Sequence, residues 1–218
     1  MPTITEQATQ VKAVSATRLP AEVVAAFASD QAALAAGGVP AGAVSVGDTL
    51  APFALSDATG QTCTLDELTA AGPAVIVFYR GGWCPYCNVA LRTYERDLLP
   101  QLTAYSAQLV AISPETPDAS LTTREKAELS YPVLSDPGAA VASSLGITFD
   151  PSKEGLAAQR QLGVDIRATR ADGATKLPMP TVVIVDRDHI VRFADIHPDY
   201  TGRTEVDEIL AALQTLPD

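Results

Sequence analysis

The chain has 218 residues, 47% of them hydrophobic, and a formal net charge of −11 at pH 7. This length and hydrophobic fraction support one large packed domain, or one domain with an appendage, without crosslinks. The negative charge argues against nucleic acid and anionic membranes as partners, because binding to either needs clustered lysine and arginine side chains.

The cysteine content and the amino terminus predict the compartment. Three cysteines are too few for a disulfide framework, since one is left over. The amino terminus lacks a basic region followed by an apolar segment, and no window approaches the ~20 apolar residues that span a bilayer. We therefore expect a cytoplasmic protein with reduced thiols at rest and no membrane association.

The first 45 residues precede the strongly patterned part of the chain. Residues 1–18 are polar and lack a regular pattern, so we expect a loosely held arm. Pro20 suits the first turn of a helix that ends at Gly37-Gly38. The apolar face of this helix consists of Val23, Val24, Phe27 and Leu34. We expect it to dock on the protein's own core or on a second subunit, which would make a homodimer.

A β-hairpin and a buried strand follow. Residues 53–56 and 61–65 flank a turn that contains Asp57 and Gly60, which predicts the hairpin. Cys63 lies on its second strand, where we expect it to serve packing. A short helical turn begins near Asp66. Residues 74–79 are apolar without alternation, which is typical of a central strand covered on both faces.

The stretch that follows this strand carries the chemistry. Gly81-Gly82 end the strand, Trp83 and Cys84-Pro85-Tyr86-Cys87 come next, and a helical pattern starts at once. The apolar positions of that helix are Leu91, Tyr94, Leu98, Leu102 and Tyr105. Pro100 lies within it and should kink it. The first turn of a helix stabilises a thiolate, so a cysteine there has a lowered pKa and is reactive.

The cysteine pair has two other possible interpretations. It could form half of a zinc site, but the remaining candidate ligands, Cys63, His189 and His197, are scattered, so we expect no metal. It could also be two ordinary buried cysteines. The order strand, glycine pair, tryptophan, Cys-x-x-Cys and helix favours a redox role instead.

The second half of the chain continues the alternation of strands and helices. Residues 109–113 and 133–134 are expected strands, with helices over 117–129 and 139–145, which implies a largely parallel sheet. Residues 146–178 interrupt the alternation, and we interpret them as an insertion with a helix at 155–162. The predicted ending is a hairpin of residues 181–185 and 190–194, and then a helix capped by Thr204.

This order resembles the thioredoxin fold, from about residue 46 to the carboxyl end. Thioredoxin-fold proteins carry a cis-proline beside the redox cysteines, and Met179-Pro180 occupies the matching place. More narrowly, the chain resembles the peroxiredoxin-like AhpC/TSA family. The residues that carry this are Phe78-Tyr79, the hairpin 53–65, Tyr-Pro-Val-Leu-Ser-Asp at 131–136, and Val-Ile-Val-Asp at 183–186.

The resemblance implies residue roles and departures from the family pattern. Peroxiredoxins carry P-x-x-x-T-x-x-C after the strand, which places Arg80 at the proline, Cys84 at the threonine and Cys87 at the peroxide-attacking cysteine. The family arginine ahead of the late strand is replaced by Met179-Pro180. Arg80 or Arg92 is the candidate source of positive charge.

The resemblance implies an oxidoreductase without a cofactor. We expect a thiol-dependent peroxidase that reduces hydrogen peroxide or organic hydroperoxides through a Cys87 sulfenic acid and a Cys84–Cys87 disulfide, re-reduced by thioredoxin or a low-molecular-weight thiol. Two alternatives stay open: a thioredoxin-like disulfide oxidoreductase in which Cys84 attacks, and a redox-inert interaction protein. The expected site environment is Arg80, Trp83, Pro85, Tyr86, Met179 and Pro180.

Overall fold

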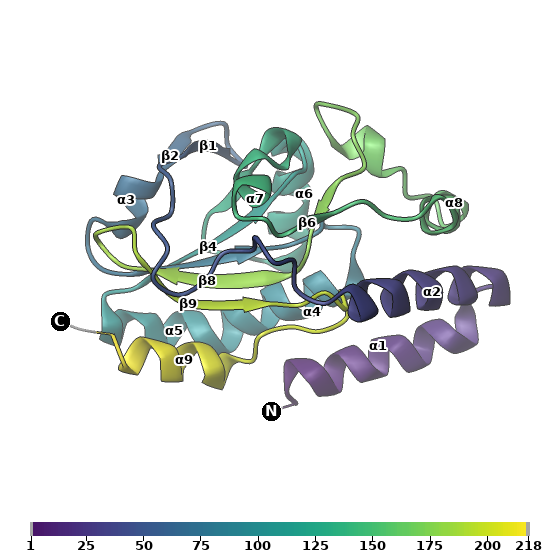
Figure 1. The fold of residues 1–218 in the computed structure, drawn as a ribbon, viewed down its shortest axis with the longest axis horizontal. Helices are drawn as coiled ribbons and strands as arrows, with labels where there is room; N and C mark the ends of the chain where they lie inside the picture. Colours follow the sequence, from purple (N-terminus) through teal and green to yellow (C-terminus); the bar gives the residue numbers. More distant parts are fainter. Residues whose placement is uncertain (1, 217–218) are drawn as a thin grey trace.

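The computed structural model describes residues 2–216. Its centre is a seven-stranded mixed sheet in the order β2-β1-β5-β4-β3-β8-β9, with helices on both faces (Figure 1). The strands are β1 (Ala54–Asp57), β2 (Thr62–Thr64), β3 (Ala74–Phe78), β4 (Gln108–Ser113), β5 (Val133–Ser135), β8 (Thr181–Val185) and β9 (Val191–Ile196). The expected α/β architecture is confirmed.

Strand β3 lies in the interior of the sheet, where both of its faces are covered, and its side chains are apolar on both faces. It pairs in parallel with β4 and antiparallel with β8, and all five of its residues are buried. Val75 and Val77 point into one core, while Ile76 and Phe78 point into the other. This explains why its sequence shows no polar alternation.

Helices form a layer on each side of the sheet. The helices of the main body are α3 (Leu65–Thr69), α4 (Pro85–Thr93), α5 (Leu99–Leu102), α6 (Pro117–Ala127), α7 (Ala140–Ser144) and α9 (Val206–Gln214). Residues of α4 and α9 pack in one core, and residues of α3 and α7 pack in the other. None of the helices within residues 2–216 combines the length and apolar character needed to cross a bilayer.

The expected kink near Pro100 takes the form of a π-helical turn. Residues Tyr94–Leu98 form this turn between α4 and α5, and the Leu99 N–H donates to the Tyr94 carbonyl. Pro100 cannot donate a hydrogen bond, so the ladder must be interrupted at this point. A π-turn is a common cause of such a bend.

The amino terminus differs from its prediction. Residues 1–18 were expected to be a loose arm, but α1 (Ile4–Arg18) is a helix with a capping box between Thr3 and Glu6. Ile4 is fully buried, and the N–H groups of Ile4 and Thr5 donate to the Glu205 carboxylate at 2.9 and 2.8 Å. The sequence pattern missed α1 because its buried face holds only Ile4 and Ala8.

The second helix follows its prediction and contacts the insertion. Helix α2 (Ala21–Gly37) packs against α8 (Lys153–Gln161), so it docks on its own chain. Residues 146–178 also include a small sheet of β6 (Thr148–Phe149) and β7 (Leu177–Pro178). The division into an extension of residues 1–45 and a domain of residues 46–218 stays a prediction.

Two predictions near the late hairpin are wrong. No peptide bond within residues 2–216 is cis, so Met179-Pro180 is trans. The Met179 N–H donates to the Ile147 carbonyl at 2.7 Å and the Pro180 carbonyl accepts from the His197 N–H at 2.9 Å, which holds the chain extended into β8. The cap of α9 is Glu205 rather than Thr204, whose hydroxyl donates to Asp195 at 2.8 Å.

Candidate active site

The two cysteines lie where the central strand passes into α4. Cys84 is the N-cap residue of α4, and Cys87 lies in its first turn. Both are free thiols with an exposed fraction of 0%. The tight loop before them depends on Gly81, which has a φ of 150° and whose added Cβ would collide with the Trp83 indole nitrogen and the Glu115 carboxylate.

Arg80 occupies an aromatic cage beside Cys84. Its guanidinium carbon lies 3.9 Å from the ring centre of Tyr200 and 4.8 Å from that of Trp83, and the Phe149 ring also faces it. Its Nη1 lies 3.8 Å from the Cys84 sulfur. The rings favour a cation at this place without neutralising it.

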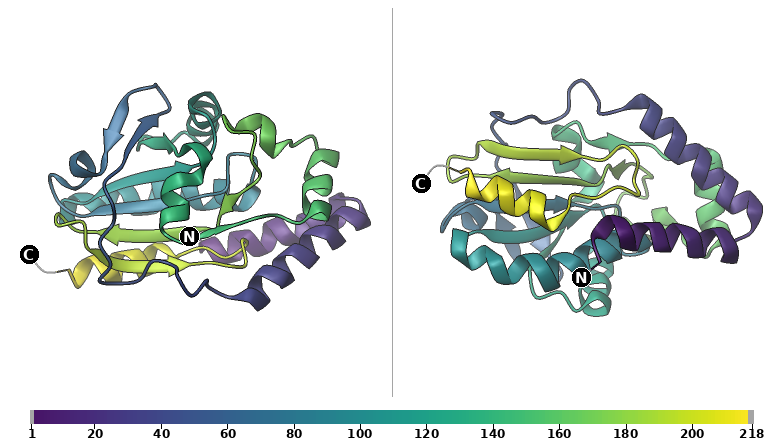
Figure 2. Two further views of the ribbon diagram at one scale, coloured as in Figure 1. Left: turned by 45° about the horizontal axis from the view of Figure 1, so that its top comes forward. Right: turned by 90° about the horizontal axis from the view of Figure 1, so that it is seen from below.

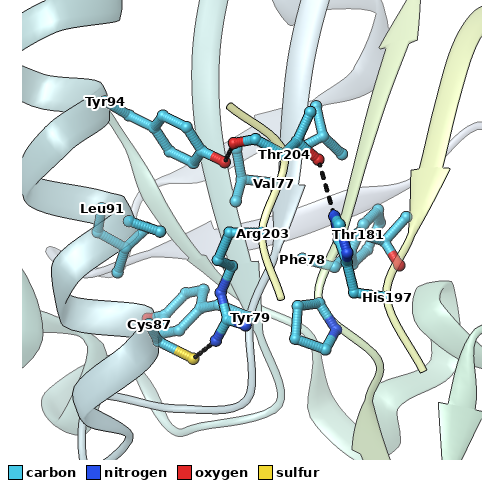
Figure 3. Close-up of a pocket in the computed structure, with 13 residues that line it drawn as sticks. Val77, Phe78, Tyr79, Cys87, Leu91, Tyr94, Thr181, His197, Arg203 and Thr204 are labelled. Carbon is cyan, nitrogen blue, oxygen red and sulfur yellow. Dashed lines mark hydrogen bonds between the residues drawn. The ribbon is translucent and has the colours of Figure 1, made fainter. Parts of the chain in front are cut away.

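Arg203 brings a second buried positive charge to the pair. It belongs to the loop between β9 and α9, and its Nη2 lies 3.0 Å from the Cys87 sulfur and 4.0 Å from the Cys84 sulfur. Its Nη1 donates to the Tyr200 carbonyl at 2.6 Å and also to the Gly202 carbonyl, which fixes the guanidinium. Figure 3 shows the guanidinium directed at Cys87.

The two arginines favour a thiolate in this site. Among the residues that the structure describes, neither Arg80 nor Arg203 forms an ion pair with a carboxylate. A buried positive charge without a negative partner is unfavourable. A thiolate on one of the two cysteines would provide that negative partner for both arginines.

The pKa values of the two cysteines are driven apart. Burial opposes ionisation of Cys84, but a hydrogen bond from the Cys87 thiol and the two arginine charges hold the pKa of Cys84 well below its usual value. Burial and the neighbouring Cys84 thiolate raise the pKa of Cys87 well above its usual value. These directions make Cys84 the more acidic of the two thiols, although the Arg203 guanidinium lies closer to the Cys87 sulfur, at 3.0 Å against 4.0 Å.

The two sulfurs face different spaces. Cys84 is one of the residues that line a mainly apolar pocket of about 210 Å³, which residues of α1, α2 and α8 also line. Cys87 faces a space of about 10 Å³, lined in part by Tyr94, His197 and Arg203 (Figure 3). The larger space adjoins Cys84, although both cysteines are fully buried.

Glu115 is a buried carboxyl next to the cysteine loop. It is 3% exposed, and its Oε2 accepts a hydrogen bond from the Gly82 N–H at 2.8 Å. Burial and the negative charge of Cys84 raise the pKa of Glu115 to about 7, despite that hydrogen bond. Glu115 therefore titrates in the physiological range and senses the charge on Cys84.

The structure brings the predicted site residues together, with one exception. Arg80, Trp83, Pro85 and Tyr86 line the pocket beside Cys84, and Pro180 lines the space beside Cys87. Met179 is buried in a neighbouring cluster with Tyr200 and Trp83. Arg92 does not reach the cysteines, because its guanidinium donates to the Lys126 carbonyl at 2.7 Å.

Sequence reasoning missed Arg203, Glu115 and Tyr200. Arg203 lies 116 positions from Cys87, in a polar loop with no local pattern that marks it. Glu115 follows a buried strand, which was the one available signal, because parallel strands end at the same sheet edge. No group of three or more His, Cys, Asp or Glu side chains suited to a metal occurs in residues 2–216.

Residues 46–194 match the sequence profile of the AhpC/TSA family. The chain belongs to the AhpC/TSA family. A putative peroxiredoxin from Mycobacterium tuberculosis strain H37Rv is 34% identical over 101 residues, which are 46% of this chain and 65% of that relative. A second putative peroxiredoxin from the same strain is 35% identical over 101 residues, which are 62% of that relative's length. The matched segment thus spans less than two thirds of the length of these relatives.

Solved structures of the family share the fold. Peroxidoxin BcpB from Mycobacterium tuberculosis is 25% identical, with a TM-score of 0.61 over 79% of this chain and 98% of that one. Reduced Prx3 from Vibrio vulnificus, solved in complex with hydrogen peroxide, is 21% identical, with a TM-score of 0.63 over 79% of this chain and 97% of that one. The AhpC/TSA chain therefore has the thioredoxin-like fold that its sequence order predicts.

Proposed function

We propose that this protein is a thiol-dependent peroxidase whose reactive centre is the Cys84–Cys87 pair. The observation that carries the proposal is the convergence of two buried arginines on two buried thiols, with Nη–Sγ distances of 3.0 to 4.0 Å. Membership of the AhpC/TSA family and the peroxiredoxin names of its relatives support the same reaction class.

The proposed reaction has two steps on the protein. A cysteine thiolate attacks the outer oxygen of the peroxide, the O–O bond breaks, and the leaving oxygen takes a proton to become water or an alcohol. The sulfur is oxidised to a sulfenic acid. The second thiol then condenses with it, which forms the disulfide and releases water. An external thiol, such as thioredoxin or a low-molecular-weight thiol, returns both sulfurs to the reduced state.

We assign the first attack to Cys84 and the condensation to Cys87. Loop length alone predicts the reverse order, with Cys87 at the peroxidatic position. The lowered pKa of Cys84 and the larger space beside it favour Cys84. Positive charge also stabilises the alkoxide or hydroxide that leaves, and both arginines lie within 4.0 Å of the Cys84 sulfur.

The runner-up function is disulfide exchange with another protein. It is favoured by the same low pKa of Cys84 at a helix N-cap, which is the arrangement of an attacking thiol in exchange reactions. Its weakness is the complete burial of both sulfurs, which hinders a protein disulfide more than a small peroxide.

Rapid mixing separates the two functions. Trp83 is the only tryptophan in the chain, and it precedes Cys84 directly, so its fluorescence reports the state of the pair. Reduced protein mixed with a stoichiometric amount of peroxide should change fluorescence in a peroxide-dependent way and lose two thiols. Rapid reduction of insulin disulfides, without any response to peroxide, would instead make disulfide exchange the better-supported function.

A further inference from the structure

The pocket beside Cys84 is built partly from residues outside the family-matching segment. That segment covers residues 46–194, whereas Leu19 and Phe27 of the pocket wall belong to the amino-terminal extension. Gln159 and Val164 close the pocket from the insertion. Figure 2 shows α1, α2 and α8 gathered at one end of the sheet. The part of the wall formed by α1 and α2 therefore lies outside the segment that matches the family, whereas Gln159 and Val164 lie within it.

The size and lining of the pocket favour a compact hydrocarbon group. An apolar cavity of about 150 Å³ accepts a benzene ring, and this pocket has about 210 Å³ with a mainly apolar lining. Burying hydrocarbon against such walls is favourable in proportion to the area buried. Hydrogen peroxide has no hydrocarbon group, so its binding gains no free energy from the apolar walls of the pocket.

Two of the residues that line the pocket also carry buried polar atoms without a partner. Gln159 Oε1 and Arg80 Nε have no hydrogen-bond partner among the described residues, although both side chains are buried. One atom is an acceptor and the other a donor. A hydroperoxide group offers both roles, because its O–H donates and its oxygens accept, whereas a plain hydrocarbon would leave both atoms unsatisfied.

We propose that the helix pair α1–α2, with α8, selects the substrate by enclosing the hydrocarbon group of a compact aryl or branched-alkyl hydroperoxide. This inference rests on the proposed peroxidase function. The Cys84 thiolate forms the S–O bond, the O–O bond breaks, and the alcohol leaves with a proton, so the sulfur loses two electrons and the hydroperoxide gains them. Cys84 lines the pocket with an exposed fraction of 0%, so its sulfur must become accessible from the pocket before it reacts.

Two alanine positions on α2 provide the test and its control. Both alanines are exposed on α2, but Ala28 lines the pocket and Ala25 does not. The Ala28→Leu variant fills the pocket, and the Ala25→Leu variant adds the same side chain elsewhere; leucine suits a helix almost as well as alanine. The rate constants for oxidation of the reduced proteins by cumene hydroperoxide and by hydrogen peroxide are measured through Trp83 fluorescence.

The expected result is selective. Ala28→Leu lowers the cumene hydroperoxide rate constant by about tenfold, the usual size of a steric change in an apolar pocket, and leaves that for hydrogen peroxide nearly unchanged. Ala25→Leu changes neither. An equal loss with both peroxides, or no loss with either, overturns the inference.

A binding measurement separates this inference from the proposed function. The alcohol product, 2-phenyl-2-propanol, is titrated into Cys84→Ser protein, with Trp83 fluorescence as the readout. Saturable binding that Ala28→Leu weakens supports the pocket even if no peroxide oxidises the protein. If peroxide oxidises the protein but the alcohol does not bind, the pocket inference fails and the peroxidase stands.

Discussion

Arg203 and Cys87 lie 116 positions apart in the chain, yet the Arg203 Nη2 is 3.0 Å from the Cys87 sulfur. The loop between β9 and α9 carries Arg203 to the start of α4, where backbone carbonyls of Tyr200 and Gly202 hold the guanidinium in place. Arg203 thus brings a positive charge to the cysteines from the loop after β9. In the family pattern, an arginine ahead of the late strand stands where this chain has Met179-Pro180.

Removing the Arg203 charge should weaken the thiolate. In Arg203→Gln we expect a raised pKa for the reactive thiol, because the positive charge that favours the anion is lost. The pH at which the rate of alkylation by iodoacetamide reaches half of its maximum should move upward in the variant. The measurement is the pH dependence of that rate, with circular dichroism as the check on folding.

Arg92→Gln is the matched control. Arg92 is an exposed arginine of α4 that bonds to the Lys126 carbonyl and does not contact the cysteines. Its replacement should leave the alkylation profile unchanged. Equal profiles for the Arg203 variant and the wild-type protein would contradict the role given to Arg203.

Oxidation should join Cys84 to Cys87 and leave Cys63 as a thiol. Cys63 is on the edge strand β2, which is four strand spacings from β3, or about 19 Å. A disulfide requires Cα atoms within about 7 Å. Burial and nearby carboxylates also raise the pKa of Cys63. Alkylation followed by peptide mass mapping of the oxidised protein checks this, and a main product containing a Cys63 disulfide would refute it.

Glu115 should make stability depend on pH. Its pKa is raised to about 7 by burial, so the folded state holds the proton more tightly than the unfolded chain does. The stability gained from this is present below the ordinary glutamate pKa and is lost as the pH rises through about 7. The change is about 3 kcal/mol between pH 4 and pH 8.

Glu115→Gln isolates this effect. Glutamine keeps an acceptor for the Gly82 N–H but does not titrate. Urea unfolding at pH 4, 6 and 8 should show the wild-type protein losing stability relative to the variant as pH rises. Parallel curves across that range would mean that Glu115 stays ionised in the folded protein.

The Glu205 carboxylate should hold α1 in place. It accepts from the Ile4 and Thr5 N–H groups and from the Thr5 hydroxyl, at 2.7 to 2.9 Å, where it also opposes the positive end of the α1 dipole. We expect Glu205→Gln to lower the free energy of unfolding by about 1 kcal/mol and to speed amide hydrogen exchange in residues 4–18. The control is Asp207→Asn, which removes an exposed acid from the first turn of the helix that Glu205 caps and should leave hydrogen exchange in residues 4–18 unchanged.

The sequence predicted the elements whose cause is local. Strand β3 was visible because five buried apolar residues follow one another, and the helix start at the cysteines was visible from the glycine pair and the leucine spacing. Helix α1 was missed because few of its residues are buried. The Thr3-x-x-Glu6 capping box was its one available signal.

The parts of the site that depend on tertiary placement could not be predicted. Arg80 was found because it adjoins the cysteines in sequence, but Arg203 reaches them only through the path of the β9–α9 loop. The trans peptide at Met179-Pro180 shows the limit of analogy, because the resemblance to the thioredoxin fold predicted a cis bond there.

The most direct test of the proposed mechanism is sulfenic acid trapping in the two single serine variants. Each reduced variant is mixed with low peroxide and a dimedone-type reagent, and the labelled cysteine is identified by mass spectrometry. A sulfenic acid persists when no thiol can condense with it. We predict that Cys87→Ser is labelled at Cys84 and consumes one equivalent of peroxide, while Cys84→Ser is inert. Labelling at Cys87 in Cys84→Ser, with Cys87→Ser inert, would contradict the assignment, and no labelling in either variant would contradict the peroxidase function.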